Sequence, residues 1–183
     1  MQLNKTLIRP FTFSLNMNLP YTVDEVNNEI KSYDFTPLGK GRHISGFRSK
    51  ILDEMQQVII DHSFLDEFYK FDEFRQMWPT LTLEELKNKT SFNCALYKDS
   101  PGFSMGSHLD SRQLVVVGMI FLNPTNIPEQ NTVLYSNKLK DNPQNLPSGL
   151  GDGWVMANAH NTWHSGGNQS TQDRYSILFN YAL

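Results

Sequence analysis

A histidine and an aspartate stand two residues apart in the stretch "GSHLDSRQLVVVG", just before a run of valines. These residues are His108 and Asp110. On a β-strand, side chains two positions apart lie on the same face, so both would point to one side while Leu109 points to the other. An imidazole nitrogen and a carboxylate oxygen brought together in this way can bind a metal ion. Because one such pair arises readily by chance, a metal site needs further ligands to support it.

A second cluster, "NTWHSGGNQSTQDRYSILF", offers a further ligand and a cation. His164 comes first, and a predicted glycine-rich turn separates it from Arg174 and Ser176 on the next predicted strand. Arg174 and Ser176 share a face, and an arginine that faces an apolar interior is costly unless it pairs with an anion. A carboxylate is the natural partner, because the planar guanidinium can donate two parallel hydrogen bonds to it. The serine hydroxyl adds another donor.

His160 is an alternative to His164 as the second histidine ligand. The two are four residues apart, which is the spacing of a metal-binding pair on a helix. However, "HNTWH" lies among glycine, asparagine and β-forming residues and contains no glutamate, so a helix is a poor fit there. The spacing to Arg174 also favours His164.

Two histidines and one carboxylate are the ligands of non-haem Fe(II) oxygenases. The ordered set of an HxD motif, a distal histidine, an arginine ten residues later and a serine two residues after that resembles the Fe(II)/2-oxoglutarate-dependent oxygenases. The local setting is similar to the prolyl-hydroxylase-like branch. There, a strand carrying a tyrosine precedes the HxD motif, as Tyr97 does here, and a later strand ends in a sequence like "IFLN" at 120–123. The resemblance covers roughly residues 91–180.

The resemblance implies a set of cofactors and a role for each motif residue. Fe(II) would be held by His108, Asp110 and His164. Arg174 and Ser176 would bind the distal carboxylate of 2-oxoglutarate, and Tyr97 could add a hydrogen bond. The chain would use O₂ to hydroxylate a C–H bond, with succinate and CO₂ as coproducts and ascorbate as a supportive reductant. The leading substrate is a prolyl or other residue of a polypeptide, and a small molecule is the other possibility.

Three further residues and one segment bear on this interpretation. Phe121 stands where several prolyl hydroxylases have a tyrosine that reaches the cosubstrate, so Ser176 would have to take over that contact. Arg112 and Trp163 flank the proposed ligands and could face the substrate. The basic, glycine-containing stretch 36–50 is predicted as a solvated loop, and the functional alternative is a mobile lid or a contact for an acidic substrate.

Three alternatives remain beside this hypothesis. One is a nucleic-acid demethylase of the same superfamily, which usually has a second arginine after the distal histidine. Another is a non-catalytic jelly-roll module, although a decayed site tends to lose a ligand. The last is a cupin-type metal enzyme that does not use 2-oxoglutarate. Such an enzyme has no need of an inward arginine and serine, so Arg174 and Ser176 discriminate against it.

The elements that must position these residues differ between the two halves of the chain. In residues 1–90 we predict a short strand in "RPFTFSL", a helix that begins with the capping box of Thr22 and Glu25, one or two helices within 49–78 and a short helix in "TLTLEELKNK". Residues 91–183 hold short runs of Val, Ile, Phe and Tyr between turn-forming clusters. The sequence therefore predicts a mainly β, α+β fold: one domain spanning 1–183, with roughly eight strands in a double-stranded β-helix (jelly roll, cupin-like) and N-terminal helices packed outside.

Composition limits the partners and the compartment. The 183 residues carry a formal net charge of −3, which gives no broad basic surface and makes nucleic acid an unlikely partner. Cys94 is the single cysteine and is expected to be buried, so the chain fits a reducing compartment. No signal peptide or membrane span is visible in the sequence. We therefore expect a cytoplasmic protein without membrane association.

Overall fold

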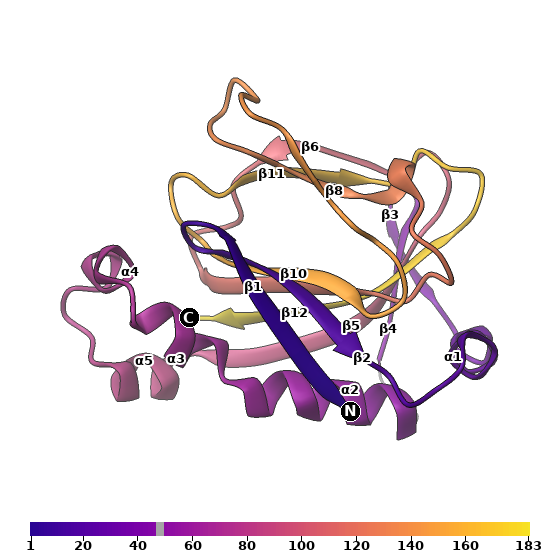
Figure 1. Cartoon of the computed structure of the whole chain (residues 1–183), viewed down its shortest axis with the longest axis horizontal. Helices are drawn as coiled ribbons and strands as arrows, with labels where there is room; N and C mark the ends of the chain where they lie inside the picture. Colours follow the sequence, from indigo (N-terminus) through magenta and orange to yellow (C-terminus); the bar gives the residue numbers. More distant parts are fainter. Residues whose placement is uncertain (47–49) are drawn as a thin grey trace.

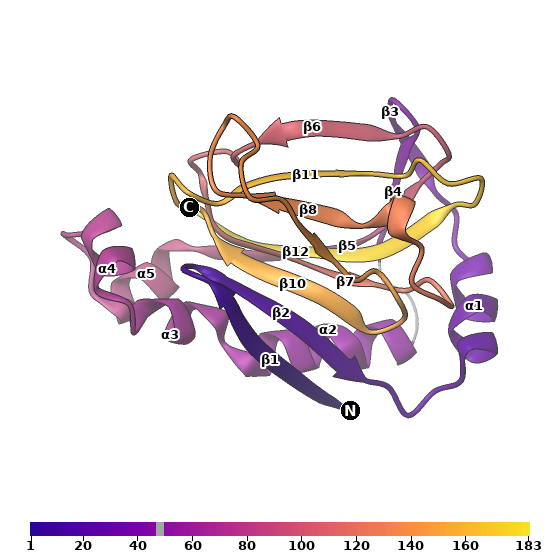
Figure 2. The ribbon, with the colours of Figure 1, turned by 45° about the horizontal axis from the view of Figure 1, so that its top comes forward.

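Two β-sheets face each other in the computed structural model, which describes residues 1–46 and 50–183 (Figure 1). The larger sheet has eight strands in the order β1-β2-β10-β7-β12-β5-β4-β3, and the smaller has four in the order β6-β11-β8-β9. The strands of the larger sheet are β1 (Gln2–Arg9), β2 (Thr12–Asn18), β10 (Asp152–Ala157), β7 (Leu114–Phe121), β12 (Arg174–Ala182), β5 (Ser91–Asp99), β4 (Arg42–Ser45) and β3 (Thr36–Gly39). Those of the smaller sheet are β6 (Ser104–His108), β11 (Trp163–Gly167), β8 (Thr132–Tyr135) and β9 (Gln144–Leu146). Figure 2 shows the smaller sheet lying over the larger one, as in a barrel with open ends.

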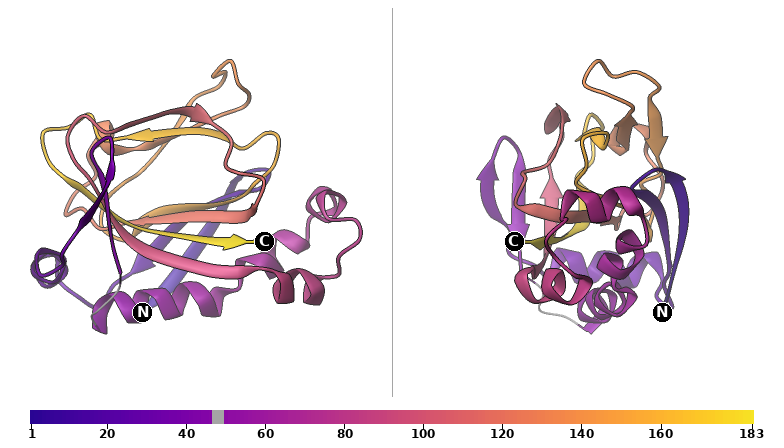
Figure 3. Two further views of the ribbon diagram at one scale, coloured as in Figure 1. Left: turned by 180° about the vertical axis from the view of Figure 1, so that it is seen from behind. Right: turned by 90° about the vertical axis from the view of Figure 1, so that its left-hand side faces the viewer.

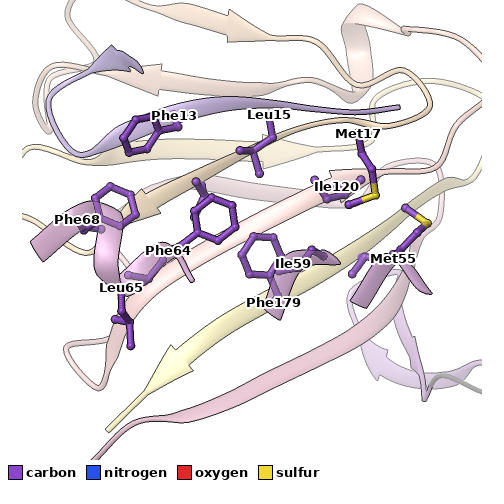
Figure 4. Close-up of a cluster of buried hydrophobic side chains, with 14 of the residues drawn as sticks. Phe13, Leu15, Met17, Met55, Ile59, Phe64, Leu65, Phe68, Ile120 and Phe179 are labelled. Carbon is purple, nitrogen blue, oxygen red and sulfur yellow. The ribbon is translucent and has the colours of Figure 1, made fainter. Parts of the chain in front are cut away.

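Helices lie on the outer side of the larger sheet and at its two ends, as Figures 1 and 3 show. They are α1 (Val23–Lys31), α2 (Lys50–His62), α3 (Phe64–Tyr69), α4 (Asp72–Met77) and α5 (Leu83–Lys89), and a 3-10 turn, η1, spans Pro128–Gln130. Helix α1 begins at the predicted capping box, in which Thr22 Oγ1 accepts from Glu25 N and the Glu25 carboxylate accepts from Thr22 N. Ile59, Phe64 and Phe68 are fully buried against sheet residues such as Phe13 and Phe179 (Figure 4). Burying each such side chain contributes about 1.5–3 kcal/mol.

Alternation along the strands of the larger sheet separates this core from the barrel interior. On β12, Ile177 and Phe179 belong to the helix-side core, whereas Arg174, Ser176 and Leu178 are on the opposite, inner face. The inner face also holds a second apolar cluster that includes Val117, Met119, Phe121, Leu134, Leu146, Trp154 and Met156. Arg174 and Ser176 therefore lie inside the barrel, as the sequence predicted.

Gly118 in the middle of β7 permits the closest packing across the larger sheet. A Cβ atom at this position would lie 2.1 Å from Cζ of the Phe179 ring. Because Phe179 is directly opposite Gly118 in the β7–β12 pairing, its ring lies flat over the glycine. This contact explains why a strand otherwise built of large apolar residues contains a glycine.

The double-stranded β-helix with outer helices is confirmed, but several local predictions were wrong. The stretch "RPFTFSL" is not one strand, because Pro10 and Phe11 form the turn between β1 and β2. Residues 50–77 form three helices rather than one or two. Residues 36–45 form the hairpin β3–β4, which pairs with β5, instead of a loop, and 47–49 of the predicted loop lie outside the described residues. In the part of the chain that the structure describes, no helix is long and apolar enough to cross a membrane.

Candidate metal centre and anion site

His108, Asp110 and His164 come together at one end of the barrel interior. One potential ligand atom from each lies within 4.8 Å of the others. The Nε2 atom of His108 is 3.7 Å from Asp110 Oδ1, and Nε2 of His164 is 3.8 Å from Asp110 Oδ2. These separations exceed hydrogen-bond distance and suit atoms that surround a common ion.

The two histidines reach the site from neighbouring strands, and the aspartate reaches it from a loop. His108 is the last residue of β6 and is paired directly with His164 on β11. From the HxD spacing we expected strand alternation to place Asp110 on the same face as His108. This was wrong, because Asp110 lies beyond the end of β6. Instead, Asn158 Nδ2 donates to the backbone oxygens of Asp110 at 3.3 Å and Ser111 at 2.6 Å, which holds the loop.

Backbone carbonyls orient both imidazole rings. His108 Nδ1 lies 2.8 Å from Gly106 O, and His164 Nδ1 lies 3.1 Å from Thr162 O. A neutral ring that donates from Nδ1 leaves the Nε2 lone pair for a metal. Burial lowers the pKa of His164, which favours that neutral form, although the Asp110 carboxylate opposes the shift. Nε2 of His108 is buried and has no hydrogen-bond partner among the described residues, so a ligand atom without a bond faces the centre.

His160, the alternative ligand, is exposed and is not one of the three grouped residues. It lies in the turn that precedes β11 and not on a helix. His164 is buried instead, because β11 pairs with both β6 and β8. The glycine-rich segment after it is therefore part of a strand and not the turn that the sequence suggested.

Arg174 is buried inside the barrel, with 1% of its surface exposed, and its anion partner belongs to the chain itself. Its Nε and Nη2 donate to Asp99 Oδ2 at 3.1 and 2.5 Å, and Nη1 donates to Gln130 O at 2.8 Å. Burial lowers the pKa of Arg174, and the charge of Asp99 counteracts this. A carboxylate beside Arg174 was predicted from the sequence, but Asp99 was not among the predicted site residues.

A second arginine, also missed, binds the same carboxylate. Arg42 on β4 donates from Nε to Asp99 Oδ1 at 2.6 Å and from Nη2 to Asp99 Oδ2 at 2.9 Å. Arg42 and Arg174 are the two cross-strand neighbours of Asp99, one on each side. The signal for Asp99 was available, because it is two residues after Tyr97 and so shares its face of β5. Arg42 gave no such signal, since its surroundings contain glycine, proline and lysine rather than strand-forming residues.

Ser176 and Tyr97 form a cross-strand pair of β12 and β5, two residues along each strand from the pair of Arg174 and Asp99. Ser176 is paired with Tyr97 on one side and with Phe121 on the other. Its hydroxyl is fully buried and lacks a hydrogen-bond partner within the described residues. The Tyr97 ring lies 5.2 Å from the guanidinium carbon of Arg42, and burial is the main reason that the pKa of this tyrosine is raised. Neither Ser176 nor Tyr97 lines the cavity described next.

One cavity connects the three metal ligands with the two arginines. It encloses about 50 Å³, and its lining includes His108, Asp110, His164, Arg42 and Arg174. The remaining walls are mostly apolar and include Met105, Val117, Met119, Trp154 and Leu178. A candidate metal site and a pair of buried arginines therefore share one enclosed space with mostly apolar walls.

Two larger grooves adjoin this cavity. The hairpin groove, of about 570 Å³, lies between the β3–β4 hairpin and β6 and shares Arg42, Met105 and His108 with the cavity. The helix groove, of about 480 Å³, is lined by Met77, Trp78, Leu109, Asp110, Arg112, Asn158, Ala159 and His160. Arg112 thus lies beside the metal ligands as anticipated, whereas Trp163 is half-buried and lines neither groove.

No family model and no curated protein matches the chain, but solved structures do. A prolyl-4-hydroxylase from Pseudomonas putida is 14% identical with a TM-score of 0.62, and the alignment covers 94% of this chain and 92% of that one. A prolyl hydroxylase from Trichoplax adhaerens, in complex with a hypoxia inducible factor peptide, is 14% identical with a TM-score of 0.64 and coverages of 94% and 84%. HygX from Streptomyces hygroscopicus, with nickel, 2-oxoglutarate and hygromycin B bound, is 10% identical with a TM-score of 0.55 and coverages of 94% and 83%. The chain thus shares the fold of 2-oxoglutarate–Fe(II) oxygenases and prolyl hydroxylases, as the motif resemblance implied.

Proposed function

We propose that the chain is an Fe(II)- and 2-oxoglutarate-dependent dioxygenase that hydroxylates a C–H bond. The observation that carries this proposal is the single cavity in which two histidines and an aspartate face two buried arginines. Ligands of this kind leave metal positions open, and a guanidinium at the far end suits an elongated anion that also reaches the metal.

The residues present fit both cofactors. His108, Asp110 and His164 would hold Fe(II), and the unbonded Nε2 of His108 is the atom that most needs such a partner. Arg174 would bind the distal carboxylate of 2-oxoglutarate, because only three of its five N–H groups are used by Asp99 and Gln130.

Ser176 and Tyr97 have weaker support as cofactor contacts. The Ser176 hydroxyl is unpaired and lies one row from Arg174, so a small shift of the strand or cofactor would bring it into contact. Tyr97 contacts Arg42, and its support is indirect, through the position of that side chain.

With Fe(II) and 2-oxoglutarate bound, O₂ would be the oxidant: one of its atoms would enter the succinate formed, together with CO₂, from 2-oxoglutarate, and the other would enter the substrate C–H bond. The chain's part is to position and shield. The two imidazoles and the carboxylate fix the metal, Arg174 sets the direction of the cofactor, and the apolar walls around Val117, Met119 and Trp154 exclude water.

The helix groove is the best candidate for the substrate, because its lining contains the proposed metal ligand Asp110 and neither Arg42 nor Arg174. Besides that aspartate, its polar side chains include Arg112 and His160, together with the indole of Trp78. The Trp78 Nε1 atom is buried and has no partner in the described part of the chain. These groups are mainly donors, so the substrate must offer acceptors, as the carbonyls of a polypeptide do. A prolyl or other residue of a polypeptide is therefore our leading substrate, and a small molecule is the alternative.

Anaerobic titration of the Fe(II)-loaded protein with 2-oxoglutarate tests this function directly. We expect a weak metal-to-ligand charge-transfer band in the visible, which reports chelation of the 2-oxo acid at the metal. His108→Ala should abolish the band, and Arg174→Ala should shift its appearance to higher 2-oxoglutarate concentrations. His160→Ala is the matched control and should behave as the wild type.

The outcomes separate the hypotheses. A band that persists in His108→Ala would mean that the metal is bound elsewhere. Absence of the band in a folded, iron-loaded wild-type protein would remove 2-oxoglutarate from the mechanism and favour a cupin-type or non-catalytic metal site. Wild-type behaviour in Arg174→Ala would remove the cofactor role of this arginine.

A further inference from the structure

The anion site contains more positive than negative charge. Two guanidiniums, Arg42 and Arg174, share one carboxylate, that of Asp99, and all three side chains are largely or fully withdrawn from solvent. The exposed fractions of the side chains are 15% for Arg42, 0% for Asp99 and 1% for Arg174. Within this cluster one unit of positive charge is left without a carboxylate partner, which is costly for a buried group; the other carboxylate that lines the cavity, Asp110, belongs to the candidate metal site.

We propose that Arg42 is a second cofactor-binding residue, which together with Arg174 holds the distal carboxylate of 2-oxoglutarate. This inference rests on the proposed function and adds a residue to it. With the cofactor bound, two guanidiniums would meet two carboxylates, Asp99 and the ligand's, and the buried charge would be balanced. The cofactor anion thereby completes an ionic cluster of which the chain supplies three members.

Arg42 has N–H donors that Asp99 does not use, and its side chain lines the cavity in which the cofactor would bind. Its Nε and Nη2 are used by Asp99, but the nearest partner of Nη1 is Met105 Sδ at 3.4 Å, and a thioether is a weak acceptor. Met105 and Arg42 both line the cavity that holds the metal ligands. A carboxylate that displaced the Met105 sulfur would receive a charge-assisted hydrogen bond from Nη1.

Aromatic rings fix the plane of the Arg42 guanidinium. Its central carbon lies 4.3 Å from the centroid of the Phe103 ring and 5.2 Å from that of Tyr97. Asp99, bonded to both arginines, holds the two cations in place despite their mutual repulsion. Asp99 and the two rings are therefore positioning residues, whereas Arg42 and Arg174 would touch the ligand.

Arg42 also stands where the cofactor would enter. The cavity encloses about 50 Å³, which is room for one or two water molecules, and the hairpin groove next to it encloses about 570 Å³. Arg42, Met105 and His108 line both spaces, so they form the wall between them. The Met105 side chain is long and flexible, and its displacement from this wall, with the Arg42–Asp99 ion pair kept, would join the two spaces and admit a dicarboxylate.

The test compares two ligands that differ at the distal end. 2-Oxoglutarate and 2-oxobutyrate share the 2-oxo acid group that binds the metal, but 2-oxobutyrate has no distal carboxylate. Calorimetric titration of Zn²⁺-loaded protein, in which no turnover occurs, measures the Kd of each. Arg42→Ala should raise the Kd of 2-oxoglutarate about ten- to a hundredfold and leave that of 2-oxobutyrate unchanged, because a charge-assisted hydrogen bond is lost only with the former.

Two further variants keep the test decisive. Arg42→Gln retains much of the side-chain volume and a donor toward Asp99, so it guards against loss of the fold, and it should give the same selective effect. Lys40→Ala removes an exposed charge from the same hairpin and should change neither Kd. Equal changes in both constants would assign Arg42 a structural role only. Unchanged constants in folded Arg42→Gln would overturn this inference alone, whereas a wild-type protein that does not bind 2-oxoglutarate would overturn the proposed function with it.

Discussion

His108 and His164 face each other across the β6–β11 pair, with ring centroids 4.4 Å apart and each Nδ1 at the carbonyl of the residue two positions earlier. The two strands thus present equivalent Nε2 atoms from the same height of the smaller sheet. The relative position of the two Nε2 atoms is therefore set by the register in which β6 and β11 pair. A slip of the register by one residue would separate the two ligands.

Removal of one ligand should abolish metal-dependent stabilisation. In the wild type, adding Mn²⁺ or Fe(II) at about a hundred times its Kd should stabilise the fold by about 2.7 kcal/mol, because only the folded chain presents all three ligands. His164→Ala should show no such gain in a thermal melt, and EDTA should reverse the gain in the wild type. His160→Ala should melt as the wild type does with and without metal. A full metal-induced shift in His164→Ala would contradict the ligand assignment.

Asp99 should be the most sensitive member of the ionic cluster. Asp99→Asn leaves two buried guanidiniums without a counter-charge, and breaking a buried pair in this way costs about 3–5 kcal/mol. Arg42→Gln should cost less, since the Arg174–Asp99 pair survives. Urea unfolding of the two variants and the wild type checks this order. Equal stability of Asp99→Asn and wild type would show that the cluster does not stabilise the apo protein.

Gly118 should not tolerate a methyl group. Its Cβ would meet the Phe179 ring at 2.1 Å, so Gly118→Ala should destabilise the protein by about 1–3 kcal/mol, the usual cost of overpacking. Phe179→Leu should make room, so the double variant should lose less than the sum of the two single variants. Gly106→Ala is the control, because no atom lies within 4 Å of the added Cβ. Additive losses in the double variant would exclude the ring contact as the cause.

Cys94 should be unreactive in the folded protein. Its side chain is partly buried, and this burial raises the pKa of the thiol to about 12, so only a small fraction carries the reactive thiolate at pH 8. Alkylation by iodoacetamide should therefore be slow in buffer and fast in urea. The raised pKa also means that the unfolded chain loses this proton first, so the thiol's contribution to stability is complete below pH 9.0 and is lost as the pH rises toward 12. Rapid alkylation of the native protein would contradict the burial.

Substitutions in the helix groove should separate substrate binding from cofactor binding. Arg112→Ala and Trp78→Phe should leave the 2-oxoglutarate Kd unchanged, because neither side chain lines the cofactor cavity. Both should reduce the fraction of 2-oxoglutarate consumption that ends in hydroxylation. Mass spectrometry of a peptide array, scored for the gain of one oxygen atom, measures the effect once a substrate peptide is found. A change in cofactor Kd would show that the groove serves the cofactor instead.

The sequence predicted well whatever depends on strand alternation. The inward pair Arg174 and Ser176 follows from their spacing on an apolar strand, and both side chains are buried on the inner face. The identity of the HxD motif could also be read directly. The convergence of its aspartate with His164 was implied only by the family resemblance. Strand alternation does not give it, because Asp110 lies in a loop whose backbone accepts a hydrogen bond from the side-chain amide of Asn158.

Segments whose own composition does not favour a strand, but which pair with neighbouring strands, were not predicted from the sequence. Gly166 and Gly167 suggest a turn, yet β11 is paired on both sides, and a Cβ at Gly167 would lie 2.9 Å from Phe103 O. Glycine is required there because the chains approach closely, which no local pattern reveals. Arg42 is similar: its strand has poor β-forming composition and is held by pairing with β5. Its partner Asp99 is 57 residues away in the sequence, so their ion pair could not be inferred locally.

The placement of the first four strands has a consequence for engineering. Strands β1 and β2 flank one side of the larger sheet and β3 and β4 flank the other, so residues 2–45 cover both margins of the sheet formed by the second half of the chain. A fragment that began at Ser91 would retain the metal-binding motif, but it would expose β5 and β10 as unprotected edges prone to self-association. It would also lose Arg42. Shortened variants of this protein, including circular permutants and fusions, must therefore keep the N-terminal hairpins as part of the folded unit.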